Sequence, residues 1–73
     1  MLKWIRLQSS VISASVYCGS SLYIRFIDHD EYEYLNVPKN IYDKLLSAPS
    51  AGQYFNIYIK PYYQYQQLQH NQS

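Results

Sequence analysis

The residues of this chain best suited to chemistry are basic side chains interleaved with tyrosines. Lys60 precedes Tyr62, Tyr63 and Tyr65, and Arg25 lies near Tyr23 on a predicted strand. Aromatic rings beside cationic groups can stack on nucleotide bases while the cations hold phosphates. An ordinary amphipathic surface has the same composition, so a binding surface and a surface without a ligand both remain open here.

A second group is the acidic segment 28–33, which reads Asp-His-Asp-Glu-Tyr-Glu. Consecutive side chains in a tight turn splay outward, and no second cluster supplies the further oxygen ligands that calcium or magnesium prefers. We therefore expect a solvated acidic turn and no metal site.

Nucleophilic catalysis has few candidates. Cys18 is the only cysteine, and His29 is the only histidine outside the polar tail. A nucleophile needs a base that a third group orients, and nothing in the sequence brings His29 near Cys18 or a serine. The two glycines, Gly19 and Gly52, lie in no phosphate-binding loop. We expect no catalytic site and no cofactor.

Composition narrows the class of protein further. The 73 residues form one domain with a thin core, and a single cysteine excludes an internal disulfide. Formation of a homodimer is therefore a plausible additional source of stability. A net charge of +1 argues against purely electrostatic binding of nucleic acid, whereas ten tyrosines suit an interface. The apolar runs are too short for a membrane span, and no secretory signal is visible, which predicts a cytoplasmic setting.

Hydrophobic alternation predicts three strands, over residues 9–17, 22–27 and 31–37. In the first strand Ile12, Ala14 and Val16 form the apolar face. In the third, Tyr32 and Tyr34 share one face. Short turns between the strands imply an antiparallel meander.

Two helices are predicted to follow. Pro38 suits the first position of a helix whose apolar stripe spans residues 41–46, and Pro49 ends it. Ser50 and Gln53 form a capping box for a second helix over residues 50–60. The aromatic and β-branched composition of 54–59 would suit a fourth strand instead, but the cap is the more specific signal.

The sequence thus predicts an α+β fold: a three-stranded antiparallel meander followed by two helices packed on one face, then an extended C-terminal segment. Residues 61–65 are expected to be extended and to return along the sheet edge. Residues 66–73 are polar and predict a frayed tail. We place a lead-in at 1–8, a single domain at 9–68 and a flexible tail at 69–73.

The order of short motifs resembles the KTSC domain, a small domain also found at the C-terminus of some lysyl-tRNA synthetases. The resemblance covers residues 9–68 and rests on a serine-rich strand, Leu22-Tyr23-Ile24-Arg25-Phe26, Tyr32-Glu33-Tyr34, Val37-Pro38, Ile41-Tyr42, the segment 48–56 ending in Phe55-Asn56, Ile59-Lys60, and Tyr63 with Tyr65. It implies a central Tyr-x-Tyr hallmark, here Tyr32 and Tyr34. It also implies no enzyme activity, and RNA binding through the synthetase context.

Two departures weaken the RNA hypothesis for this member. A glycine-containing turn before the Tyr-x-Tyr is replaced by the acidic turn 28–30, and usually basic places are occupied by Ile57 and Tyr58. Both changes favour contact with protein.

Two hypotheses follow, and neither involves a membrane. The first is a non-catalytic RNA-binding module; its candidate residues, which also serve for a protein partner, are Arg25, Tyr32, Tyr34, Asn56, Lys60 and Tyr62. Here the tyrosines stack on bases while Arg25 and Lys60 hold phosphates. The second is a protein-interaction module, or a small inhibitor or accessory protein, that uses the same surface. The sequence leaves open whether Tyr32 and Tyr34 face the core or the solvent.

Overall fold

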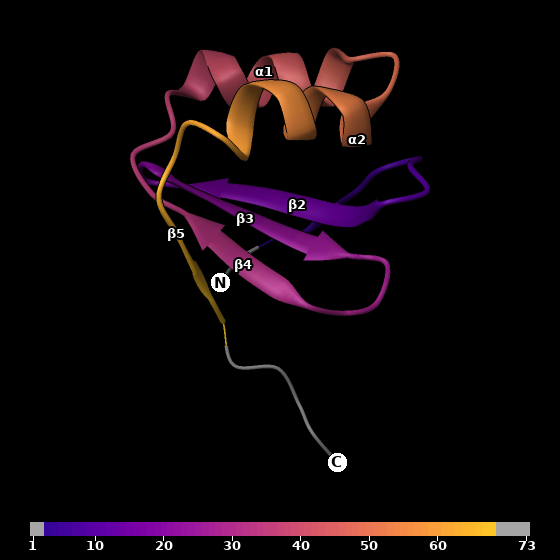
Figure 1. Ribbon diagram of the computed structural model, residues 1–73, viewed down its shortest axis with the longest axis horizontal. Helices are drawn as coiled ribbons and strands as arrows, with labels where there is room; N and C mark the ends of the chain where they lie inside the picture. Colours follow the sequence, from indigo (N-terminus) through magenta and orange to yellow (C-terminus); the bar gives the residue numbers. More distant parts are fainter. Residues whose placement is uncertain (1–2, 69–73) are drawn as a thin grey trace.

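The computed structural model describes residues 3–68, which form one antiparallel sheet with helices on one of its faces (Figure 1). The elements are, in chain order, β1 (Ile5–Arg6), β2 (Ile12–Cys18), β3 (Ser21–Phe26), β4 (Glu31–Tyr34), α1 (Lys39–Ser47), α2 (Ala51–Tyr54) with its continuation η1 (Phe55–Ile59), and β5 (Tyr65–Gln67). The five strands lie in sequence order, and each pairs antiparallel to its neighbour. Within the described range, none of the helices has the length and apolar character needed to cross a membrane.

The α+β fold is as predicted, but the number of strands is not. The predicted meander forms the centre of the sheet, and two short edge strands extend it. In the predicted lead-in, Ile5 pairs with Ser15, and at the other edge Tyr65 pairs with Tyr34. Gln66 and Gln67 belong to β5 and not to a tail. Edge strands of two and three residues are too short to show a periodic pattern. The predicted flexible tail at 69–73 lies outside the described residues.

A β-bulge in β2 changes which of its side chains face the helices. The register shifts between Ile12 and Ala14. After the bulge, Ser15 lies opposite the core residue Ile24, and its hydroxyl is hydrogen-bonded to a tyrosine of α1. Alternation then places Ala14 and Val16 on the far side of the sheet, where they are also buried. The predicted apolar face of this strand is therefore wrong beyond Ile12, because an extra residue in one strand reverses the alternation.

The two helices begin and end close to where local signals place them. Pro38 is the cap residue of α1 and not its first helical residue, so the helix begins one residue later than predicted, at Lys39. The hydroxyl of Ser50 accepts a hydrogen bond from the backbone N–H of Gln53 at 3.3 Å, so the cap of α2 is confirmed and the alternative strand is wrong. A Cβ on Gly52 would lie 3.2 Å from the Val11 side chain, so glycine allows this helix to approach the start of β2.

The core lies between the sheet and the helices. Its buried members come from both layers: Ile12, Leu22, Ile24, Tyr34, Val37, Tyr42, Leu45, Ala51, Phe55 and Ile59. Tyr34 is thus a core residue, which answers part of the question that the sequence left open.

Candidate functional site

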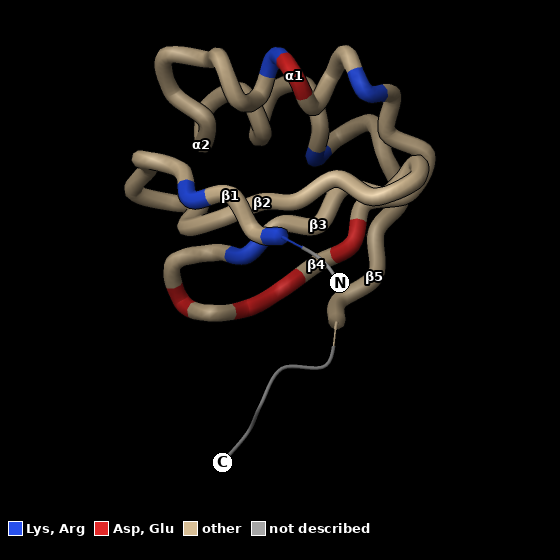
Figure 2. The backbone as a smooth tube through the Cα atoms, turned by 180° about the vertical axis from the view of Figure 1, so that it is seen from behind, with Lys and Arg blue, Asp and Glu red and all other residues tan. Residues whose placement is uncertain are grey.

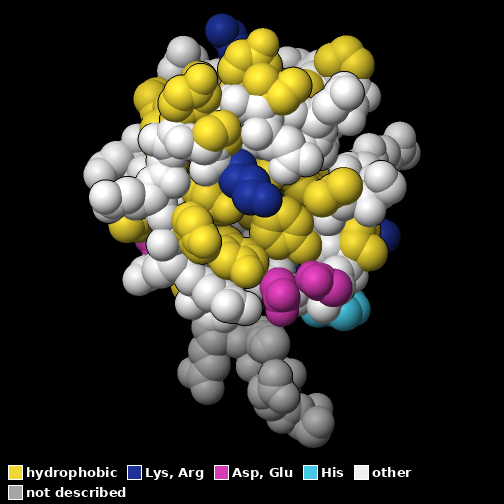
Figure 3. Space-filling view, in the orientation of Figure 1, with side chains coloured by type: hydrophobic (Ala, Val, Ile, Leu, Met, Phe, Trp, Pro, Cys, Tyr) yellow, Lys and Arg dark blue, Asp and Glu magenta, His cyan; other side chains and the backbone are white. Residues whose placement is uncertain are grey.

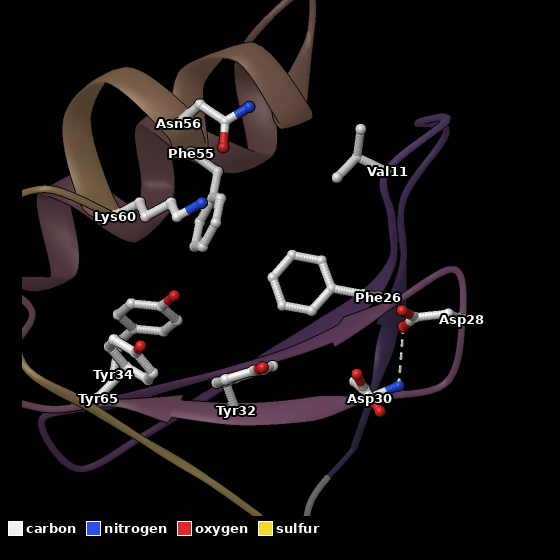
Figure 4. A pocket seen from close by; sticks show the side chains of 10 residues that line it. All are labelled: Val11, Phe26, Asp28, Asp30, Tyr32, Tyr34, Phe55, Asn56, Lys60 and Tyr65. Carbon is white, nitrogen blue, oxygen red and sulfur yellow. Dashed lines mark hydrogen bonds between the residues drawn. The ribbon is translucent and has the colours of Figure 1, made fainter.

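A cleft of about 310 Å³ opens between the sheet and the second helix (Figure 4). Its walls are formed by Val11, Phe26, Asp28, Asp30, Tyr32, Tyr34, Phe55, Asn56, Lys60 and Tyr65. Figure 3 shows this face as a hollow with apolar and aromatic walls, crossed by a cationic side chain and edged by acidic ones. The volume is at the small end for ligand pockets, which suits one amino-acid residue or one nucleobase.

Tyr34 sits at the floor of the cleft. Its side chain is only 3% exposed, and its ring packs edge-on against Phe55 at a centroid distance of 5.2 Å. The hydroxyl points into the cleft (Figure 4), and it has no hydrogen-bond partner among residues 3–68. Burial, with smaller contributions from Tyr65 and Tyr32, raises the pKa of Tyr34 to about 12. At neutral pH the hydroxyl is therefore protonated and able to donate.

Tyr32 and Tyr65 continue the aromatic wall. The half-buried Tyr32 ring lies 5.5 Å from Phe26 and 5.4 Å from Tyr65, measured between centroids. Both rings of the Tyr-x-Tyr pair are engaged by other aromatic residues, so they do not form an open platform for stacking bases. Tyr32 lines the cleft and Tyr34 lies beneath it.

The second helix supplies the polar groups on the opposite wall. The helix widens at η1, where the backbone N–H of Lys60 donates to the carbonyl of Phe55 at 2.9 Å. Insertions of this kind are frequent at functional sites. Asn56 and Lys60 are four residues apart, so they lie on the same side of the helix, and both line the cleft (Figure 4). Lys60 forms no ion pair with any residue in the range 3–68.

Acidic residues form the other end of the cleft. Asp28 and Asp30 come from the β3–β4 turn, where the Asp28 carboxylate accepts a hydrogen bond from the Asp30 backbone N–H at 3.1 Å. His29 between them has a φ of 76°, a conformation that favours glycine. The described residues contain no group of three or more histidines, cysteines or carboxylates arranged to hold a metal. The cleft is thus positive at its helix end and negative at its turn end.

The structure brings four of the six predicted binding residues together. Tyr32, Tyr34, Asn56 and Lys60 all line the cleft. Tyr62 is 73% exposed and lies outside it.

Arg25 also lies apart from the cleft, because strand alternation points it to the far face of the sheet. There its Nε donates to Glu31 at 2.8 Å, and its guanidinium lies 4.2 Å above the Trp4 ring. Figure 2 shows basic and acidic positions side by side along β3 and β4.

Sequence reasoning missed several residues of the site. Asp28 and Asp30 were interpreted only as a solvated turn, yet they line the cleft together with Phe26 and Tyr65. Alternation in β3 was a usable signal, since it places Phe26 on the helix-facing side next to the Tyr-x-Tyr pair.

The geometry separates Cys18 from His29. They lie beyond opposite ends of β3, and a six-residue strand is about 20 Å long. The histidine therefore cannot act as a base for this thiol.

Comparison with known proteins identifies the family. The KTSC domain profile matches residues 8–63, which is most of the chain and includes the Tyr-x-Tyr pair and the second helix. The chain belongs to the KTSC domain family. The resemblance inferred from the motifs is therefore confirmed.

Relatives of this KTSC domain occur both inside larger proteins and as small proteins. A lysine–tRNA ligase of Nostoc sp. is 42% identical over 48 residues, which cover 66% of this chain and 9% of the ligase. The chain thus spans about a tenth of the length of that relative. A protein of Tsukamurella paurometabola is 38% identical over 56 residues, covering 74% of this chain and 84% of that protein.

The fold also matches a solved structure. The crystal structure of a KTSC domain protein from Yersinia pestis superposes with a TM-score of 0.88 at 27% sequence identity. The match covers 94% of this chain and all of the other, so the five-stranded sheet with its helices is an arrangement shared between the two proteins.

Proposed function

We propose that this KTSC domain is a binding module that takes one residue of a polypeptide partner into the tyrosine-lined cleft. The observation that carries the proposal is the Tyr34 hydroxyl, which ends a buried side chain, points into the cleft and has no hydrogen-bond partner among residues 3–68. No buried side-chain polar atom among the described residues lacks a partner, so the Tyr34 oxygen is open to the space of the cleft. A ligand atom that enters the cleft could therefore accept a hydrogen bond from this hydroxyl, and Lys60 lines the same cleft.

Charge favours a polypeptide over RNA. Asp28 and Asp30 at the cleft would repel a phosphate backbone, and Glu31 already compensates the charge of Arg25 on the opposite face. Binding of nucleic acid depends on several cations that neutralise phosphates together. Among the predicted binding residues only Lys60 brings an unpaired positive charge to the cleft.

Ring packing favours the same choice. Tyr32 and Tyr34 contact Phe26, Phe55 and Tyr65, so their rings are enclosed and not open to successive bases. Aromatic walls around a small cleft are instead typical of sites that anchor a single side chain of a protein partner. The lysine–tRNA ligase relatives give RNA a place as the competing ligand class.

The test is peptide display followed by binding measurements on purified protein. Peptides selected by the wild-type domain should bind about fivefold more weakly to Tyr34→Phe, which loses one hydrogen bond, and about tenfold more weakly to Lys60→Met. Tyr62→Phe and Lys44→Met lie outside the cleft and serve as matched controls that keep wild-type affinity.

RNA is tested in parallel with transfer RNA and single-stranded oligonucleotides at low salt. We expect no binding. An affinity for RNA that falls steeply with salt and is lost in Lys60→Met, with no peptide selected, would overturn the polypeptide proposal.

A further inference from the structure

We infer that the residue taken into the cleft is a lysine or arginine at the C-terminus of the partner, with its α-carboxylate at the helix end and its side-chain cation at the turn end. This inference rests on the proposed function, since it names the chemistry of the group that the same cleft would accept.

The helix end of the cleft is built to accept an anion. Two donors from different elements face the cleft there, the Lys60 ammonium and the Tyr34 hydroxyl, while Asn56 turns its carbonyl oxygen toward the cleft (Figure 4). A peptide carbonyl offers two lone pairs and no charge, whereas a carboxylate offers two oxygens and a negative charge. Lys60 has no ion-pair partner among residues 3–68, and a carboxylate in the cleft would be one. A hydrogen bond between an ammonium and a carboxylate is about twice as strong as one between neutral groups.

The middle of the cleft is apolar and aromatic. Phe26 and Tyr32 pack edge-on at 5.5 Å and line the space between the helix end and the turn. The aliphatic stem of a lysine or arginine can lie along such a surface while its charged head stays polar. A cation near the Tyr32 ring would also gain a cation–π contact.

The turn end complements a cation. Asp28 and Asp30 line the cleft there, and the turn is held by backbone hydrogen bonds from Phe26 to Asp30 and from His29 to Phe26, each 2.9 Å long. An acidic side chain in the cleft would satisfy Lys60 but meet these carboxylates. A C-terminal basic residue brings an anion to Lys60 and a cation to the side of the cleft with Asp28, and its size fits a cleft of about 310 Å³.

The experiment compares labelled peptides that differ only at the last residue, with affinity measured by fluorescence anisotropy. A peptide ending in lysine with a free carboxylate should bind about tenfold more tightly than the same peptide as its C-terminal amide. It should also bind about tenfold more tightly than the peptide ending in norleucine, which keeps the stem and lacks the cation.

Two variants separate the ends of the cleft. Lys60→Met should abolish the preference for the free acid over the amide while leaving the preference for lysine over norleucine. The double variant Asp28→Asn with Asp30→Asn should abolish the preference for lysine over norleucine while leaving the preference for the free acid over the amide. Lys44→Met and Asp43→Asn, both on the exposed side of α1, should keep both preferences.

Other outcomes overturn the inference in distinguishable ways. Selected peptides that bind equally as acid and amide would refute the C-terminal basic residue and leave the polypeptide proposal standing. Displacement by free lysine at the same concentration as the peptide would show that the ligand is the amino acid alone, against a polypeptide terminus. Absence of any peptide binding would remove both proposals together.

Discussion

Ionisation of Tyr34 should destabilise the fold at alkaline pH, and the substitution Tyr34→Phe should remove that part of the destabilisation. The side chain is 3% exposed, and burial raises its pKa from the ordinary value of 10.0 to about 12. The folded state therefore keeps a proton that the unfolded state loses. Stability from this group is complete below pH 10 and is lost as the pH rises through the folded pKa.

The magnitude follows from the two pKa values. They differ by about two units, which at about 1.4 kcal/mol per unit sets an upper limit of about 2.7 kcal/mol on the change in the free energy of unfolding. Because the hydroxyl opens on solvent in the cleft, screening reduces the effect expected at about pH 11.5 to on the order of 1 kcal/mol. Near neutral pH the substitution should change stability by less than about 0.5 kcal/mol, because the hydroxyl has no protein hydrogen bond to lose.

The assay is urea unfolding followed by far-ultraviolet circular dichroism, for wild type and Tyr34→Phe, at about pH 8 and about pH 11.5. Ionisation of the other tyrosines affects both proteins and cancels in the difference between them. Tyr34→Phe should gain on the order of 1 kcal/mol on wild type between the two pH values. Tyr62→Phe, whose ring is exposed in the fold, should show no such gain. An equal loss of stability in wild type and Tyr34→Phe would refute the raised pKa of Tyr34.

Two further predictions concern local structure. Ser50→Ala should lower the free energy of unfolding by about 1 kcal/mol, because it removes the cap of the second helix. Urea unfolding would measure the loss, with Ser47→Ala as the control, since Ser47 caps no helix N-terminus. An unchanged stability would contradict the cap. His29→Gly should raise the free energy of unfolding by about 0.5 kcal/mol, since relief of the positive φ outweighs the extra freedom of glycine in the unfolded chain. Asn36→Gly at a φ of 56° should gain less, because asparagine tolerates this conformation, and a loss of stability in His29→Gly would contradict the prediction.

Features of the fold that depend on near neighbours were predictable from the sequence. The three central strands follow from alternation, and the second helix follows from Ser50 and Gln53, which interact across three residues. The family was also recognisable, since the order of its motifs is a property of the chain itself.

Features that depend on the packing of distant segments were not predictable from the sequence. β1 and β5 become strands only because β2 and β4 offer unpaired backbone groups, and the bulge after Ile12 shows only as a shift in pairing. Periodicity could not decide whether Tyr34 is buried, because both faces of the sheet carry aromatic residues.

The candidate site divides along the same line. The tyrosines, the lysine and the asparagine were identified as residue types suited to binding, but only the folded chain brings Lys60 to the same cleft as Asp28 and turns Arg25 away from it. The physical reason is that side-chain identity is local, whereas a cleft is formed by elements that meet only when the apolar faces of the sheet and the helices are buried against each other.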